Sequence, residues 1–155
     1  MRKVIRKANN ENIDEIAECL NDSDLYNNYW KDRNLTLKFI KDGISNDELF
    51  VFSSEKNNII GFIRIDFNGM FSNFPLLRVL AVKSGHRNRG IGEKLLKYYQ
   101  DLCFKNSDKV FLCVTDLNTN AQRFYGRNGF QKVGEFANLY KENINEYLMM
   151  KIFEG

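Results

Sequence analysis

The stretch "LAVKSGHRNRGIG", residues 80–92, concentrates residue types that bind anions. An apolar run ends at Val82, a short segment of basic residues and glycines follows, and an amphipathic segment starts at Ile91. A turn that leads into a helix leaves several main-chain N–H groups without partners, and the helix dipole adds positive charge there. Glycine lets the backbone approach a ligand closely. The stretch therefore predicts a cradle for a phosphate group.

The spacing of this stretch, Arg87-x-x-Gly90-x-Gly92, is neither the dinucleotide pattern GxGxxG nor a Walker A loop. Arg87 and Arg89 either contact the phosphate or are solvated surface charges. His86, the one histidine, is expected to be an exposed loop residue. A Ser-His-Asp triad would have to use it, and no GxSxG elbow is present.

A second segment with chemical potential is Asn118-x-x-Ala121-x-x-Phe124-Tyr125, which continues to Asn128-Gly129-Phe130. As an ordinary amphipathic helix it would bury its apolar residues, and Asn118 would be an N-cap. Tyr125 is either a core tyrosine with a satisfied hydroxyl or a proton donor.

Alternating and helical hydrophobic patterns predict the elements that position these segments. The expected order is β-α-α-β-β-β-α-β-α-β-β. Asn12 and Glu15 are expected to form a capping box at the first helix. Expected strands cover 3–8, 48–54, 59–67, 76–82, 110–114, 130–136 and 146–153, and expected helices cover 13–20, 35–43, 91–105 and 120–129.

Composition narrows the function classes. The 155 residues, 43% of them apolar, suit a single domain over 1–155, and a net charge of +3 is too mild to indicate nucleic acid. No apolar run approaches the roughly 18 residues of a membrane span, and the N-terminus lacks an apolar signal region. Three widely spaced cysteines favour neither disulfides nor zinc, so the cytoplasm is the expected location.

Together the two segments resemble the signatures of the GCN5-related N-acetyltransferases, the GNAT family. Arg87-x-x-Gly90-x-Gly92 resembles the acyl-CoA signature [QR]-x-x-G-x-[GA], and the second segment resembles N-x-x-A-x-x-[FL]-Y-x-x-x-G-F. "LAV" precedes the first motif at the family's offset, and a looser likeness extends from about residue 3 to 153. The resemblance implies an α/β (α+β) fold with a mixed, mostly antiparallel sheet and helices on both faces.

The resemblance also implies acetyl-CoA as co-substrate and no metal. Its slot would lie between the strands at 76–82 and 110–114, which splay apart in the family. The pantetheine arm would pair with the main chain of the first strand, and the loop, with Glu93 and Lys94, would take the pyrophosphate. The implied cofactor-binding residues are Leu80, Ala81, Val82, Arg87, Asn88, Arg89, Gly90, Ile91, Gly92, Glu93, Asn118 and Tyr125.

The family transfers the acyl group directly within a ternary complex. Tyr125 is the expected catalytic residue, because its phenol would protonate the departing thiolate, while a main-chain N–H would stabilise the oxyanion. Cys113 is expected to be a structural thiol, with a covalent acyl-cysteine as the alternative. The strand at 76–82 carries no acid, which leaves Asp66, Glu135 or a chain of waters as the base. Without a base, a low-pKa amine is favoured over lysine, since the pKa of lysine is about 10.4.

The expected function is transfer of acetyl from acetyl-CoA to a primary amine of a small molecule, a protein N-terminus or a lysine. The alternative is a non-catalytic acyl-CoA-binding sensor or interaction module. No nucleic-acid or membrane partner is expected, and the chain would be a monomer or homodimer.

Arg78 is a charged residue in an otherwise apolar strand, and it faces either the acceptor or a carboxylate partner. Asp22, Asp24 and Asp32 either attract a cationic acceptor or are solvated. An aromatic acceptor pocket would draw on Tyr26, Tyr29, Trp30, Phe39, Tyr140 and Tyr147.

Overall fold

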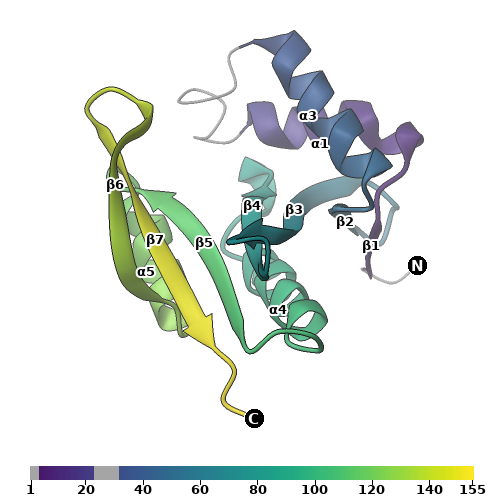
Figure 1. Cartoon of the computed structure of the whole chain (residues 1–155). Coiled ribbons are helices and arrows are strands. Elements are labelled where there is room, and N and C mark those ends of the chain that lie inside the picture. The colour runs from purple at the N-terminus through teal and green to yellow at the C-terminus, as the bar shows by residue number, and fades with distance from the viewer. Residues whose placement is uncertain (1–3, 23–31) are drawn as a thin grey trace. The chain divides into compact units, whose positions relative to one another are not determined.

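The structure is a computed structural model that describes residues 4–22 and 32–155 (Figure 1). Its helices and strands follow the predicted order, with short 3-10 turns added at Asn10–Asn12 and Ser84–His86. The elements are β1 (Val4–Lys7), α1 (Ile13–Asn21), α3 (Arg33–Ser45), β2 (Leu49–Ser53), β3 (Ile59–Met70), β4 (Phe74–Val82), α4 (Ile91–Cys103), β5 (Lys109–Thr115), α5 (Thr119–Arg127), β6 (Gln131–Lys141) and β7 (Ile144–Ile152).

The strands form a seven-stranded sheet in the order β1-β2-β3-β4-β5-β7-β6. β4 and β5 are parallel, with Leu76 opposite Phe111 and Leu77 opposite Leu112. β1–β2, β2–β3, β5–β7 and β6–β7 are antiparallel. The predicted α/β (α+β) class with a mixed, mostly antiparallel sheet is therefore confirmed.

The chain divides into two compact units. Unit 1 consists of Met1–Ile65 and Val79–Tyr99, and unit 2 of Asp66–Arg78 and Gln100–Gly155. Long elements run from one unit into the other, since β3, β4 and α4 each contribute residues to both. The assignment of residues 1–155 to one acyltransferase domain stays a prediction.

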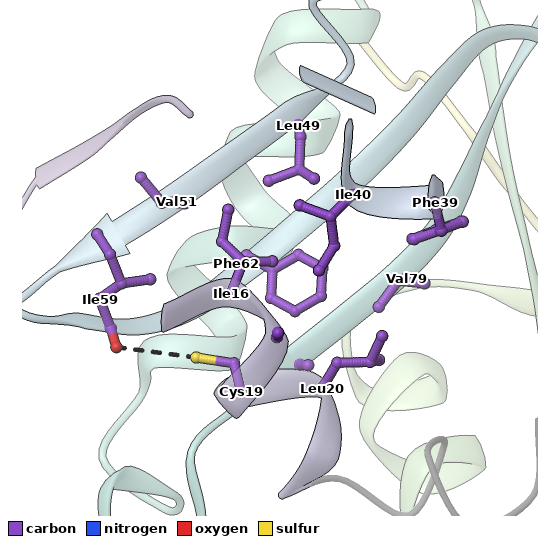
Figure 2. Packing of buried hydrophobic residues seen from close by; sticks show 12 residues of the cluster. Ile16, Cys19, Leu20, Phe39, Ile40, Leu49, Val51, Ile59, Phe62 and Val79 are labelled. Atoms are coloured by element: carbon purple, nitrogen blue, oxygen red, sulfur yellow. Dashed lines mark hydrogen bonds between the residues drawn. The ribbon is translucent and has the colours of Figure 1, made fainter. Parts of the chain in front are cut away.

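In unit 1, α1 and α3 cover one face of the sheet. Ile16 and Leu20 of α1 and Ile40 of α3 are fully buried against Phe62 of β3 (Figure 2). The Sγ of Cys19 in the same cluster lies 3.8 Å from the main-chain oxygen of Ile59. The buried apolar side chains of α1 are spaced three and four residues apart, which explains why residues 13–21 form a helix.

α4 covers the opposite face of the unit 1 sheet, where Leu95 and Tyr99 are fully buried. Tyr98 stacks on Phe50 of β2 with ring centroids 5.3 Å apart. Gly61 of β3 allows the close approach, because a Cβ there would lie 3.0 Å from the main-chain oxygen of Ala81 and 3.2 Å from Leu95 Cδ1. Unit 1 thus carries helices on both faces of its sheet, as predicted.

The predicted capping box at α1 is wrong. The Asn12 side chain instead accepts hydrogen bonds from the Asn9 main chain and from Arg6, both at 3.0 Å. Glu15 Oε2 accepts from the Ile59 main chain at 2.8 Å. Asn12 thus closes a capping box with Asn9 at the 3-10 turn Asn10–Asn12, and Glu15 binds a main-chain group that only folding brings near.

In unit 2, β5 pairs with β7 along its whole length, from Lys109–Ile152 to Thr115–Glu146. α5 lies against one face of these strands (Figure 1). Lys151 of β7 fixes the C-terminal end of α5, because its ammonium donates to the Asn128 main-chain oxygen at 2.9 Å and to Gln100 of α4 at 2.6 Å. Side chains alternate between the two faces of a strand, so Tyr147 and Met149 of β7 lie on the same face as Lys151. Glu146 and Leu148 lie on the other face.

Candidate functional site

The predicted phosphate loop of unit 1 is exposed from Arg87 to Gly90 and leads directly into α4. The first helical hydrogen bond runs from the Lys94 N–H to the Gly90 oxygen at 3.1 Å, so the N–H groups of Ile91, Gly92 and Glu93 precede the helical ladder. Asn88 and Gly90 have positive φ angles of 61° and 79°. Such left-handed residues turn successive N–H groups toward one side, which produces an anion-binding concavity.

The side chain of Arg87 holds the main chain around this loop by hydrogen bonds. Its Nε donates to the Val82 main-chain oxygen at 3.1 Å, and its Nη2 donates to the Asp22 main-chain oxygen at 2.8 Å. Asp22 Oδ2 accepts from the Ser84 N–H at 2.6 Å, and this hydrogen bond lowers the pKa of Asp22. We call this set, Asp22, Val82, Ser84 and Arg87, the loop latch. Arg89 is exposed and has no hydrogen bond or ion pair with any described residue, so its charge is available to an anion.

The three strand residues predicted to pair with pantetheine lie at the end of β4, in unit 1. Ala81 and Val82 are buried, Leu80 is half-buried, and the Val82 oxygen already accepts the bond from Arg87. The predicted splay of β4 from β5 concerns residues of different units and stays a prediction.

Asn118 of unit 2 caps α5, because its Oδ1 accepts from the Ala121 N–H at 3.0 Å. The N-cap alternative is therefore confirmed. The cap uses only the side-chain oxygen, and the Asn118 amide NH₂ has no partner among the residues that the structure describes. That donor remains available to a pantetheine carbonyl.

Tyr125 lies in the last turn of α5, and its ring centroid is 5.3 Å from that of Phe124 and 6.1 Å from that of Phe130. Desolvation raises the pKa of its phenol to about 12. No described residue hydrogen-bonds the hydroxyl, and the choice between a core tyrosine and a proton donor stays a prediction. With this pKa, the phenol of Tyr125 is protonated at neutral pH.

Cys113 is partly exposed on the face of β5 opposite to α5. Burial is the main cause that raises the pKa of its thiol to about 11; the charge of Glu146 raises it further and that of Arg78 lowers it. A thiol with this pKa is almost entirely protonated at neutral pH and is a poor nucleophile. The acyl-cysteine alternative is disfavoured on this ground.

Glu146 is an acidic residue that the sequence analysis missed. It is only 5% exposed, and it lies opposite Thr115 in the β5–β7 ladder, on the face of Cys113. The alternation in "EYLMMKIF" was the available signal, because Glu146 shares its face with Leu148 and Met150. A second missed group is Asp116, whose Oδ1 is buried with no hydrogen-bond partner in the described residues.

Asp66 and Glu135, the bases named from the sequence, each interact with a neighbouring group, and their role stays a prediction. Asp66 Oδ1 accepts from the Asn68 N–H at 3.2 Å within the second half of β3. Glu135 forms an ion pair with Lys132 at 3.0 Å. The register of β6 and β7 places Glu135 with Tyr147, on the opposite face from Glu146.

The residues named from the sequence for binding the acceptor lie in different parts of the structure. Arg78 is exposed, and its charge lowers the pKa of the Cys113 thiol and of the Tyr140 phenol. Asp32 caps α3 through the Asn34 N–H at 2.8 Å. Phe39 packs beneath the Arg64 guanidinium in the unit 1 core. The remaining candidates, Tyr26, Tyr29, Trp30 and Asp24, lie outside the described residues.

Within residues 4–22 and 32–155, no three His, Cys, Asp or Glu side chains are grouped closely enough to hold a metal ion. A search of the same residues finds no helix that is both long and apolar enough to span a membrane.

Several solved structures share this fold, and some of them are named as acetyltransferases. A GNAT-family acetyltransferase from Bacillus cereus ATCC 10987 matches with a TM-score of 0.81 and 22% identity over 100% of both chains. Ard1 from Thermoplasma volcanium matches with a TM-score of 0.80 and 23% identity, also over 100% of both chains. An aminoglycoside 6′-N-acetyltransferase complexed with coenzyme A matches with a TM-score of 0.78 and 16% identity over 96% of each chain.

The family model described as "Acetyltransferase (GNAT) family" matches residues 11–130. This range contains the phosphate loop and the segment from Asn118 to Phe130, the two motifs that the sequence analysis singled out. The chain belongs to the GNAT acetyltransferase family.

Proposed function

We propose that this chain is an N-acetyltransferase that moves the acetyl group of acetyl-CoA to a primary amine by direct transfer. The observation that carries the proposal is the Tyr125 hydroxyl, which is protonated at neutral pH and has no acceptor among the described residues. A sensor that only binds acyl-CoA has no use for such a donor. The cofactor residues named from the resemblance, a cytoplasmic location and a monomer or homodimer are part of the proposal.

In unit 1, the loop would bind the CoA pyrophosphate through main-chain N–H groups from Asn88 to Glu93. These donors, the α4 dipole and Arg89 all favour negative charge at this turn. Glu93 opposes it with one carboxylate, so binding relies on its N–H and not on its side chain. Arg87 would support the loop through the loop latch rather than through the phosphate.

In unit 2, the proton donor and the proton acceptor would lie on opposite faces of the strands. Tyr125 belongs to α5, whose C-terminal end is fixed to the Lys151 face of β7, while Glu146 points to the other face. We assign Glu146, in place of Asp66 and Glu135, as the acceptor of the amine proton. A carboxylate base removes the need for a low-pKa amine, since it can deprotonate an ammonium group within the site.

The steps balance as follows. The ammonium group gives one proton to Glu146, and the neutral nitrogen attacks the thioester carbonyl carbon. The adduct nitrogen loses a second proton to water, the C–S bond breaks, and the thiolate takes the phenol proton of Tyr125. Water reprotonates Tyr125, and Glu146 releases its proton to solvent. The sum is an ammonium ion and acetyl-CoA giving an N-acetyl amide, CoA thiol and one proton.

The test is Tyr125→Phe, with Tyr98→Phe as the matched control, because both keep the ring and remove one hydroxyl. Acetyl-CoA affinity is measured by calorimetry, and turnover on an amine panel is followed by thiol release. Loss of a general acid lowers kcat by about 10²-fold or more while the affinity for acetyl-CoA stays the same. Unchanged turnover in Tyr125→Phe removes Tyr125 from the mechanism. Binding of acetyl-CoA by the wild-type chain without turnover of any amine supports the sensor alternative.

A further inference from the structure

Arg78 is the charged residue of β4 that the proposed reaction does not use. It interrupts an otherwise apolar strand, "FPLLRVLAV", and it is exposed while its neighbours Leu77 and Val79 are buried. Its guanidinium forms no ion pair or hydrogen bond with any described residue. An arginine that only stabilised the sheet would be expected to pair with a neighbouring carboxylate, as Arg64 does with Glu48 at 3.6 Å.

The strand register shows what Arg78 faces. Leu76 and Leu77 of β4 lie opposite Phe111 and Leu112 of β5, and Arg78 and Cys113 are the next residues of the two strands. The charge of Arg78 reaches the Cys113 thiol and lowers its pKa. Cys113 in turn lies opposite Leu148 of β7, and Glu146 is two residues away on the same face. Two strand spacings, about 10 Å, separate the backbones of β4 and β7. One positive and one negative side chain therefore share one face of unit 2.

The charges on this face act on the groups between them. Arg78 lowers and Glu146 raises the pKa of both the Cys113 thiol and the Tyr140 phenol. Tyr140, whose phenol feels both charges, is a third side chain near them. Such a face complements a molecule with a cation at one end and an anion at the other.

We propose, resting on the N-acetyltransferase function above, that the acceptor carries a carboxylate as well as its amine and that Arg78 binds this carboxylate. Glu146 receives the amine end, as assigned above. The planar guanidinium offers two parallel N–H donors, which match the two oxygens of a carboxylate. A single guanidinium balances one negative charge, which favours a carboxylate over a phosphate dianion. Arg78 is thus a specificity-determining residue, and amino acids are the substrate class.

The experiment compares each amino acid with its carboxamide, which keeps the amine and removes the negative charge. A series of increasing length, glycine, β-alanine, γ-aminobutyrate and ε-aminocaproate, covers the range of separations between the two charges. The wild-type chain should show kcat/KM higher for the acid than for the amide at the best length, by about ten- to a hundredfold for a charged hydrogen-bonded pair. KM should carry most of the difference.

Three variants test whether Arg78 is the residue that binds the carboxylate. Arg78→Gln should remove the preference for the acid, because kcat/KM for the acid should fall to the value for the amide. Arg78→Lys should keep a weaker preference, since it retains the charge without the fork. Arg123→Gln on α5, an exposed arginine that hydrogen-bonds only Asn120 among the described residues, is the matched control and should keep the wild-type preference. Circular dichroism and acetyl-CoA affinity report whether each variant is folded.

The results separate the two proposals. Equal turnover of acids and amides by the wild-type chain, or an equal loss of both in Arg78→Gln, overturns the role of Arg78 while the acetyltransferase function stands. If no amine is turned over, the proposed function fails. Calorimetry on the acetyl-CoA complex then still tests Arg78, because acids must bind more tightly than amides and lose this advantage in Arg78→Gln.

Discussion

The guanidinium of Arg87 donates a hydrogen bond to the main-chain oxygen of Asp22 at 2.8 Å, across 65 positions of sequence. The same guanidinium holds the Val82 oxygen, and the Asp22 carboxylate holds the Ser84 N–H. The end of α1 is thereby tied to Arg87 at the start of the predicted phosphate loop and to Ser84 in the turn before it. An arginine of the CoA signature thus shapes the loop that presents the main-chain donors.

Arg87→Ala should weaken CoA binding by loosening the loop. Two lost hydrogen bonds of about 1 kcal/mol each predict a rise in Kd of roughly tenfold or more. The loss should depend little on salt, because the removed contacts are internal. Calorimetry at low and high ionic strength measures Kd, and hydrogen exchange of residues 84–90 reports loop opening.

Arg89→Ala is the comparison for Arg87→Ala. Its charge is exposed and unpartnered among the described residues, so its loss should weaken binding at low salt and matter less at high salt. The support role of Arg87 is wrong if Arg87→Ala shows this same salt-dependent pattern with unchanged hydrogen exchange.

Asp22→Asn should destabilise unit 1 at neutral pH and not in strong acid. The Ser84 main-chain N–H lowers the pKa of Asp22 below its usual 3.8, so the folded state favours the ionised carboxylate. The stabilisation is present above pH 3.8 and is lost as the pH falls through the lower, folded-state value. Urea unfolding at several pH values should show wild type and variant converging in acid. Glu55→Gln, at an exposed turn in the same unit, should show no comparable pH-dependent difference.

Glu146→Gln should lower turnover most for amines of high pKa. If Glu146 takes the proton, an amine of pKa near 10.4 loses about 10²-fold at pH 7, while one of pKa near 7.8, partly neutral already, loses less. Raising the pH should restore turnover of the first amine. The pH dependence of kcat/KM measures this, with Glu142→Gln in the exposed β6–β7 turn as control. A uniform loss for all amines at every pH would refute proton transfer to Glu146.

Cys113→Ser should remain active. With a thiol pKa of about 11, only roughly one molecule in three thousand carries the thiolate at pH 7.5. Iodoacetamide at that pH should therefore leave the wild-type activity largely intact. Detection of an acetylated Cys113 during turnover by mass spectrometry, together with an inactive serine variant, would establish the covalent route instead.

Gly61→Ala should destabilise the fold by about 1–3 kcal/mol through overpacking. The new Cβ would lie 3.0 Å from the Ala81 oxygen and 3.2 Å from Leu95, so α4 must move away from β3. Gly126→Ala in α5 is the matched control, because its Cβ would meet nothing within 4 Å. Alanine is the better helix former by about 0.5–1 kcal/mol, so the control should gain stability. Urea midpoints of the two variants should move in opposite directions.

The sequence alone determined the order of the elements, the fold class, the position of the loop before α4 and the helix that carries Tyr125. These features depend on local patterns: the alternation of β2 and β3, the helical spacing of α1 and α4, and the glycines and basic residues before Ile91. Local hydrogen bonding and short-range periodicity produce them, so residues close in sequence carry the information.

Only the tertiary structure decided which side chains distant in sequence lie close to one another. Arg87 meets Asp22 only because folding brings the end of α1 to the loop, and Glu15 leaves its expected cap because β3 offers it the Ile59 N–H. Arg78 and Glu146 share a face through the registers of β4 with β5 and of β5 with β7. A shift of one residue in either register would turn a side chain to the opposite face. Strand pairing is set by long-range packing of the sheet, which explains why the sequence analysis left Arg78 undecided and missed Glu146.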